Sequence, residues 1–181
     1  MPGEINELTL AAPYPPTIST DAQLDVLAGG VRELHDHIVI GGIPAAAPAP
    51  SPISWTLYGP IPAGPGRSCS GLSWSGAPTF DSGSIPITGN GSFDSPTVTL
   101  SAEGCYSYAV SLPATADSPG ADSPVGLNSE TVLAATPDVT TQTSPGPVLP
   151  HGTAHDDVEI SGTLGGLGTI TWQLLGPVDP V

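Results

Sequence analysis

The stretch Ile53-Ser54-Trp55-Thr56-Leu57-Tyr58-Gly59-Pro60 decides the fold of this chain, and it occurs twice. The second copy, ITWQLLGP at residues 170–177, starts 117 positions later and differs at three of its eight positions. In both copies a Trp and a Leu two positions further on share one face of an alternating pattern, which is typical of a half-buried strand. Because Trp is a rare residue, two of them in the same register indicate a duplication. The chain is therefore predicted to be part of a repeat array.

Two further pairs of segments extend the repeat. Residues 7–12, ELTLAA, match ETVLAA at 130–135, which is 123 positions later. Residues 35–42, HDHIVIGG, match HDDVEISG at 155–162, which is 120 positions later. We therefore expect three parts: residues 1–17 as the end strand of a preceding repeat or a tail, residues 18–143 as a complete repeat, and residues 144–181 as the start of a following, incomplete repeat.

The composition favours strands throughout. Gly and Pro each number 23 in 181 residues, yet 38% of the residues are hydrophobic, which is too apolar for a disordered tail. Short runs of Val, Ile, Thr, Trp and Tyr lie between clusters of Gly, Pro, Ser and Asn, as in strands joined by tight turns. One segment, Asp21–Ala28, is a helix candidate. We rank it below strand because the matching part of the second copy contains Pro145, Pro147 and Pro150.

The repeat has the size of an immunoglobulin-like sandwich, in which two antiparallel sheets bury their inner faces. The predicted fold class is therefore an all-β, immunoglobulin-like antiparallel β-sandwich with partial repeat units at both ends. Its candidate strands are residues 25–26, 36–40, 54–58, 79–80, 85–88, 97–101, 106–112, 131–134 and 139–141.

Three local patterns refine this prediction. Trp55 is expected in the core, and Tyr106 and Tyr108 share one face of a later strand. Gly89-Asn90-Gly91 predicts a hairpin turn, since Asn and Gly tolerate positive φ. Asn90-Gly91-Ser92 is also a formal glycosylation acceptor, although the turn by itself explains these residues.

The segment 144–181 has too few strands to close a core, and a lone hairpin is marginal in water. We expect it either to be poorly ordered in the monomer or to pair with a partner strand. The strand around residues 7–12, from the same chain or a neighbouring one, is one such donor.

The charge balance excludes several functions. The chain has two Arg, no Lys and 17 acidic residues, for a net charge of −15. Such a chain cannot neutralise phosphates, so we expect no nucleic-acid partner, and anionic membrane surfaces would repel it. No stretch is long enough to span a bilayer, so no membrane insertion is expected. The N-terminus lacks the basic start and apolar run of a signal peptide.

Two cysteines, Cys69 and Cys105, are predicted to form a disulfide, since an even count in an all-β chain of extracellular character favours pairing. The bridge would close a loop of 36 residues and stabilise the fold by about 3–4 kcal/mol. The alternative is a reactive thiol, which needs basic neighbours to lower its pKa, and Arg67 is the only one near Cys69. We therefore expect an extracellular or cell-surface location, with signal and anchor absent from this chain.

Four histidines form two groups, His35 with His37 and His151 with His155. A His-x-His strand beside a carboxylate could hold Zn²⁺. The second copy, however, has Asp157 where His37 stands, and a duplicated metal site would keep its ligands. We expect no metal and no cofactor. No nucleophile with a placed base is visible, so we expect no catalysis.

The ordered set of motifs resembles a known family. The run His-Asp-x-(Val/Ile)-x-Ile-x-Gly followed by Trp-x-Leu-x-Gly-Pro is similar to the tandem immunoglobulin-like repeats of actinobacterial cell-surface adhesins. The segments ITGNGSF at 87–93, GCYSY at 104–108 and ETV at 130–132 fit the same pattern. This resemblance covers most of residues 18–181.

Some of these repeats form an internal Thr–Gln ester, and the resemblance implies which residues correspond. Gln142 would be the acyl donor, and Asp36 and Glu130 would be the assisting acids. The nucleophilic Thr is replaced by His37, so we expect no ester and regard these four as vestigial crosslink positions. Cys105 replaces an aromatic residue of the family, and Val125 stands at the family's second Cys, so the resemblance implies a relocated disulfide.

The leading functional hypothesis is a structural or adhesive module that extends the stalk of a bacterial cell-surface repeat protein. Its partners would be neighbouring repeats in the parent chain and a host or cell-surface glycan or protein. The alternative is a carbohydrate- or protein-binding sandwich that uses Trp74 and Phe80, the aromatic residues of the 69–80 loop, as a ligand patch. A partly buried loop anchor is the other explanation of these two side chains.

Overall fold

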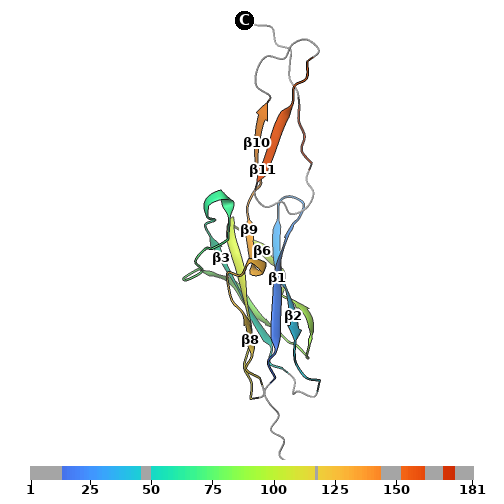
Figure 1. Ribbon diagram of the computed structural model, residues 1–181, viewed down its shortest axis with the longest axis vertical. Helices are drawn as coiled ribbons and strands as arrows, with labels where there is room; N and C mark the ends of the chain where they lie inside the picture. Colours follow the sequence, from blue (N-terminus) through green and yellow to red (C-terminus); the bar gives the residue numbers. More distant parts are fainter. Residues whose placement is uncertain (1–13, 46–49, 117, 144–151, 162–168, 174–181) are drawn as a thin grey trace, which may run out of the picture.

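The structure is a computed structural model that describes residues 14–45, 50–116, 118–143, 152–161 and 169–173. Over these residues all strands lie in antiparallel sheets, which confirms the all-β prediction (Figure 1). The elements are β1 (Thr17–Val26), β2 (Arg32–Gly41), β3 (Ile53–Ile61), η1 (Pro65–Arg67), β4 (Thr79–Ile85), β5 (Gly91–Asp94), β6 (Val98–Leu100), β7 (Gly104–Leu112), β8 (Ala121–Ser123), η2 (Asn128–Glu130), β9 (Thr131–Ala134), β10 (Asp138–Thr143) and β11 (Asp156–Ser161).

The first sheet is organised around β2. Strand β1 pairs along its whole length with β2, from Thr17 opposite Gly41 to Val26 opposite Arg32. The other edge of β2 pairs with β5 and β6. Every second residue of β2 from Leu34 to Ile40 is buried, as expected for a strand with one inner face. Strand formation over Thr17–Val26 also excludes the helix considered for Asp21–Ala28.

The second sheet has the order β4-β3-β7-β8, and β9 pairs with the end of β7. The repeated Trp stretch forms β3, between β4 and β7, and Trp55 faces the core with 4% of its surface exposed. Its indole lies over Gly83 of β4, where a Cβ would stand 2.9 Å from the indole Cζ2. Glycine at 83 therefore gives the Trp the room to lie against the sheet.

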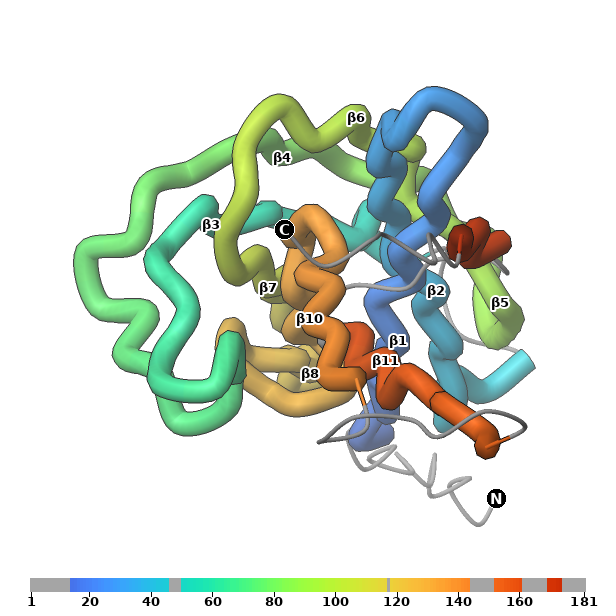
Figure 2. Tube along the Cα trace, turned by 90° about the horizontal axis from the view of Figure 1, so that it is seen from above, coloured from blue at the N-terminus to red at the C-terminus, as the bar shows by residue number. Residues whose placement is uncertain are grey.

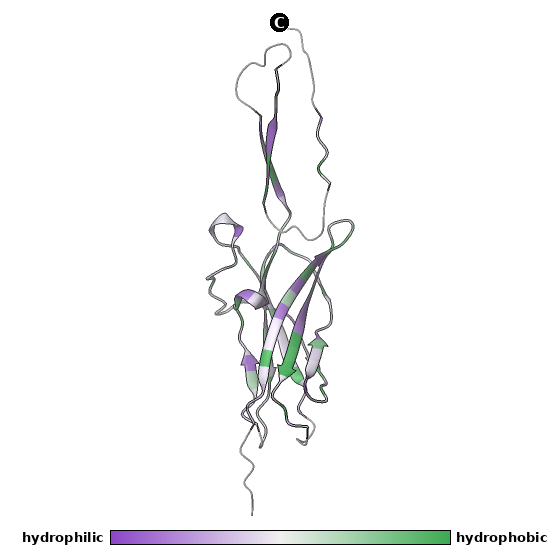
Figure 3. Cartoon of the chain, turned by 45° about the vertical axis from the view of Figure 1, so that its right-hand side comes forward, coloured by the Kyte–Doolittle hydropathy of each residue, from purple (hydrophilic) through white to green (hydrophobic). Residues whose placement is uncertain are grey.

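The two sheets pack face to face, as seen from above in Figure 2, where β1, β2 and β5 lie on one side and β3, β4, β7 and β8 on the other. Tyr108 of β7 is fully buried and meets Trp55 edge-on at a centroid distance of 5.9 Å. Hydrophobic residues are concentrated on the strands of this sandwich (Figure 3). The core cluster comprises Leu34, Ile38, Ile40, Ile43, Ile53, Trp55, Leu57, Ile87, Leu100, Tyr106, Tyr108, Val110, Leu112 and Ala134.

The turn predicted at Gly89–Gly91 is not a hairpin. Strand β4 belongs to the second sheet and β5 to the first, so this segment carries the chain from one sheet to the other. The Asn90 side chain holds the crossing in place, because its Oδ1 accepts from the Ile43 N–H and its Nδ2 donates to the Ile43 carbonyl, both at 2.8 Å. This amide is bonded to the backbone, and a glycan on Nδ2 would replace a hydrogen of the group that donates to the Ile43 carbonyl.

Strands β10 and β11 form a separate two-stranded sheet beyond one end of the sandwich (Figure 1). Residues 139–141 were expected to be the last strand of the complete repeat, whereas the structure pairs them with β11. Strand β11 therefore finds its partner in β10 of its own chain. The donor strand expected around residues 7–12 lies outside the described residues.

Candidate functional site

The sandwich contains two fully buried acids, Asp36 and Glu130. Asp36 occupies an inward position of β2 between Leu34 and Ile38, so the alternation of the strand forces its side chain into the core. Glu130 ends the turn η2 that leads into β9. Both oxygens of Asp36 and Oε2 of Glu130 have no hydrogen-bond partner among the described residues. Besides the Trp55 indole N–H, these are the buried side-chain atoms without a partner in the described part of the chain, and they make this acid pair the first candidate site.

Burial shifts the protonation of both acids. Loss of hydration, followed by the neighbouring Asp36 charge, raises the pKa of Glu130 to about 8. Burial likewise raises the pKa of Asp36 to about 6, although the Asp21 backbone acts in the opposite direction. At neutral pH the pair therefore carries about one negative charge and one proton, which reduces the cost of burying it.

Two hydroxyl groups complete the cluster. Thr20 Oγ1 of β1 and Ser123 Oγ of β8 lie 2.8 Å apart, and the Ser123 hydroxyl donates to Glu130 Oε1 at 3.5 Å. Sequence reasoning missed both residues, since they are 103 positions apart and neither stands in a repeated motif. Thr20 could have been found from the alternating pattern of β1, in which it occupies an inward position. Asp36 and Glu130 have no exposed surface, so the cluster is enclosed within the sandwich.

The structure separates the four residues named as vestigial crosslink positions. Asp36 and Glu130 are together in the core. His37 points outward, where its Nδ1 lies 2.6 Å from Asp94 Oδ1. Gln142 lies on β10, opposite Asp157 of β11 and exposed. Gln142 is therefore in a different sheet from the two acids.

The disulfide between Cys69 and Cys105 is present, which confirms that prediction. Cys105 is fully buried on β7, and Cys69 lies in the loop between η1 and β4, with the two Cα atoms 5.6 Å apart. The bridge ties this long loop to a strand of the second sheet. Disulfides of this kind persist in oxidising compartments.

Trp74 and Phe80 are both half-buried. Phe80 packs on the core and meets Tyr106 edge-on at 5.3 Å. The Trp74 indole covers Gly126, where a Cβ would come within 2.6 Å of Cδ1. The two rings thus anchor the loop to the sandwich. A ligand patch at these residues stays a prediction.

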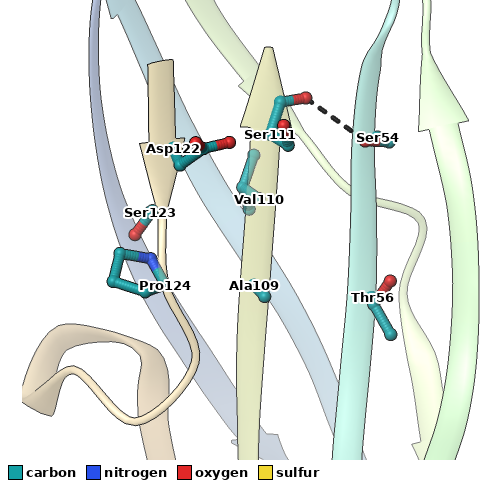
Figure 4. Close-up of a pocket in the computed structure, with 8 residues that line it drawn as sticks. All are labelled: Ser54, Thr56, Ala109, Val110, Ser111, Asp122, Ser123 and Pro124. Atoms are coloured by element: carbon teal, nitrogen blue, oxygen red, sulfur yellow. Dashed lines mark hydrogen bonds between the residues drawn. The ribbon is translucent and has the colours of Figure 1, made fainter. Parts of the chain in front are cut away.

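The surface of the second sheet has a shallow depression of about 370 Å³ (Figure 4). Small side chains line it, and in Figure 4 the side-chain oxygens belong to Ser54, Thr56, Ser111, Asp122 and Ser123. Ser54 Oγ donates to the Ser111 carbonyl at 3.3 Å. This hydroxyl already has a partner in the sheet. A second depression, of about 380 Å³, lies beside Cys69 and Thr131.

The histidines do not lie together at one site. His155 Nε2 lies 4.0 Å from Asp157 Oδ2 at the start of β11, far along the chain from His37 and Asp94. His151 lies outside the described residues. Among the described residues no group of three His, Cys, Asp or Glu side chains has the arrangement of a metal site.

The joint between the sandwich and the β10–β11 hairpin carries a cluster of polar contacts. The chain has only two basic residues, Arg32 and Arg67, and both reach Thr136 in the linker between β9 and β10. Arg32 donates to the Thr136 hydroxyl at 3.0 Å, and Arg67 donates to the Thr136 carbonyl at 2.6 Å. Glu103 accepts from the Thr136 N–H at 2.8 Å and from its hydroxyl, and lies 3.6 Å from Arg32.

Together these contacts use the N–H, the hydroxyl and the carbonyl of Thr136, which are all of its polar groups. The hydrogen bonds to Thr136 lower the pKa of Glu103, and the two arginines act in the same direction, so this acid stays charged. We name Arg32, Arg67, Glu103 and Thr136 the joint cluster. Sequence reasoning missed it, because Arg32 and Thr136 are 104 positions apart and Thr136 is an ordinary loop residue by pattern.

Comparison with known proteins found no match: no family model, no curated protein and no solved structure is similar to this chain. Within the described residues, no helix has the length and apolar character that a membrane crossing needs.

Proposed function

We propose that this chain is a structural module of a bacterial cell-surface repeat protein, in which β-sandwich units follow one another as a stalk or spacer. The joint cluster is the observation that carries the proposal. A linker between freely moving domains is expected to have few contacts, whereas here both cations of the chain hold the residue at which one unit passes into the next. A joint held in this way fixes the orientation of one unit relative to the next.

The end-to-end arrangement supports the same function. In Figure 1 the hairpin β10–β11 continues the long axis of the sandwich and does not fold back on it. The disulfide adds covalent strength to the second sheet, and the resemblance to actinobacterial adhesin repeats agrees with an extracellular stalk. On this view the boundary between units lies in the linker at 135–137, ahead of β10.

The test measures the stiffness of the joint. We expect the hairpin and the sandwich to tumble as one body in NMR relaxation, and to tumble separately in a variant with Arg32→Gln and Arg67→Gln. A variant with Glu33→Gln, which neighbours Arg32 and lies outside the joint cluster, is the control and should behave as the wild type. Independent tumbling in the wild-type protein would contradict the spacer function.

The second candidate function is glycan or protein binding through the 69–80 loop, and the partial exposure of Trp74 is the observation that favours it. A glycan array with the wild type and with Trp74→Ala tests it. Binding that is lost in Trp74→Ala would replace the spacer proposal with a lectin-like one.

A further inference from the structure

The β10–β11 hairpin repeats the β1–β2 hairpin in the same register. In the first hairpin Thr20 is opposite Ile38, and Ile18 is opposite Ile40. In the second, Thr141 is opposite Val158, and Val139 is opposite Ile160. Each β10 residue stands 121 positions after its β1 counterpart and each β11 residue 120 positions after its β2 counterpart. The second hairpin therefore has the pairing, and the inward face, of the first two strands of a sandwich.

That inward face is exposed. Ile38 is fully buried in the complete sandwich, whereas its counterpart Val158 is 40% exposed and Val139, the counterpart of Ile18, is 52% exposed. The repeated Trp stretch behaves in the same way, since Trp55 is 4% exposed and Trp172 is 83% exposed. In the described part of the chain, core positions of a second sandwich thus face solvent without the strands that would cover them.

In the complete sandwich β7, β8, η2 and β9 all contact β1. Of these, η2 carries Glu130, which belongs to the buried cluster with Thr20. The sequence that begins at Glu130 and includes β9, ETVLAA at 130–135, recurs as ELTLAA at 7–12 with four of six residues identical. Residues 7–12 therefore have the sequence that fits against a copy of β1, and β10 is such a copy.

Within one molecule this segment cannot reach the hairpin. In Figure 1 β1 runs along the sandwich towards β10. Its last residue, Val26, pairs with Arg32 of the joint cluster, so its first residue is at the other end of the sandwich. The ten residues of β1 span about 33 Å. The four residues 13–16 between the segment and β1 span about 14 Å at most. The chain between the segment and β1 is therefore too short for the segment to lie along the hairpin of its own molecule.

We propose that the exposed face of the β10–β11 hairpin binds residues 7–12 of a second copy of this chain, so that copies join head to tail. The segment would supply part of the missing layer by packing on the face of the hairpin, as η2 and β9 pack against β1 across the complete sandwich. Because the two contacting surfaces differ, each added copy presents a new hairpin, and the association continues as a filament unless it closes into a ring.

The net charge of −15 opposes this association, and salt screens the repulsion. The test is therefore sedimentation velocity of the full chain at 0.15 and 0.5 M salt, over protein concentrations from about 1 to 200 µM. We expect the weight-average mass to rise with protein concentration beyond that of a dimer, and the association to be stronger at the higher salt concentration.

Matched variants identify the two surfaces. Val158→Lys places a charge on the inward face of β11, and we expect it to weaken association at least tenfold. Its neighbour Glu159 corresponds to the outward residue Val39, so Glu159→Lys adds the same side chain on the other face and should associate at least as well as the wild type. The urea midpoint of the sandwich should be unchanged in both variants, since the hairpin lies outside it.

A chain that begins at Tyr14 tests the donor. We expect it to be monomeric, and we expect the free peptide of residues 1–13 to inhibit association of the full chain while a scrambled peptide does not. Undiminished association of the shortened chain would show that hairpins pair with each other and would overturn the proposed occupant. A full chain that stays monomeric at every concentration and salt level would overturn the proposal as a whole.

Discussion

At pH 7 the Glu130 carboxyl is mostly protonated because burial raises its pKa to about 8, and this gives the sandwich an unusual pH dependence. The unfolded chain has the ordinary pKa of 4.5 and releases its proton first. The stability due to the raised pKa is therefore fully present below pH 4.5 and is lost as the pH rises to 8. We expect a loss of about 1.4 kcal/mol per pH unit from this group.

Glu130→Gln separates this effect from that of Asp36, whose raised pKa of about 6 confines its contribution to lower pH. Between pH 6 and 8 the wild type should lose stability in urea titrations, and the variant should change little. Parallel curves for the two proteins over this range would show that Glu130 is not the titrating group.

At Gly83 the core residue Trp55 leaves no room for a side chain. A Cβ at this position would lie 2.9 Å from Trp55 Cζ2 and 3.0 Å from Cε2, and the buried indole cannot move away. We expect Gly83→Ala to destabilise the sandwich by about 1–3 kcal/mol. Ser84→Ala, at the exposed neighbouring position of β4, is the control, with an expected change within about 0.5 kcal/mol. Equal urea midpoints for the two variants would contradict this packing.

At the scale of elements, the disulfide connects the loop after η1 to strand β7. Its removal frees a segment of 36 residues in the unfolded chain, so we expect Cys69→Ala/Cys105→Ala to lose about 3–4 kcal/mol. The wild type under reducing conditions should match the double variant in urea unfolding. If reduction leaves the midpoint unchanged, the bridge does not stabilise the sandwich.

Periodicity predicted the elements better than it predicted their connections. Alternation predicted that Trp55 lies in the core and that Tyr106 and Tyr108 share one face of a strand, and in the structure all three are buried. The cysteine count predicted the disulfide. The same local rules failed at Asn90, because glycine and asparagine suit a crossing between sheets as well as a hairpin. Asp36 and Glu130 were singled out through a family resemblance, whereas their hydroxyl neighbours and the joint cluster join residues about a hundred positions apart, which no local pattern encodes.

At the scale of the whole molecule, the sandwich formed by β1 to β9 is expected to unfold independently of the hairpin. A chain of residues 14–137 contains the complete core cluster and lacks β10 and β11. We expect its free energy of unfolding and its urea m-value to equal those of the full chain within about 0.5 kcal/mol and about 10%, respectively. A clearly smaller m-value would show that the hairpin unfolds with the sandwich as one cooperative unit.

Because both arginines are committed to Thr136, the bending stiffness of an array of such units depends on charge-assisted bonds at one residue per unit. The screening length falls from about 10 Å in 0.1 M salt to about 3 Å in 1 M salt. The units themselves depend on an apolar core and a disulfide, which screening does not weaken. The persistence length of the array would therefore decrease with ionic strength while each unit keeps its shape, so that ambient salt controls how far the array extends.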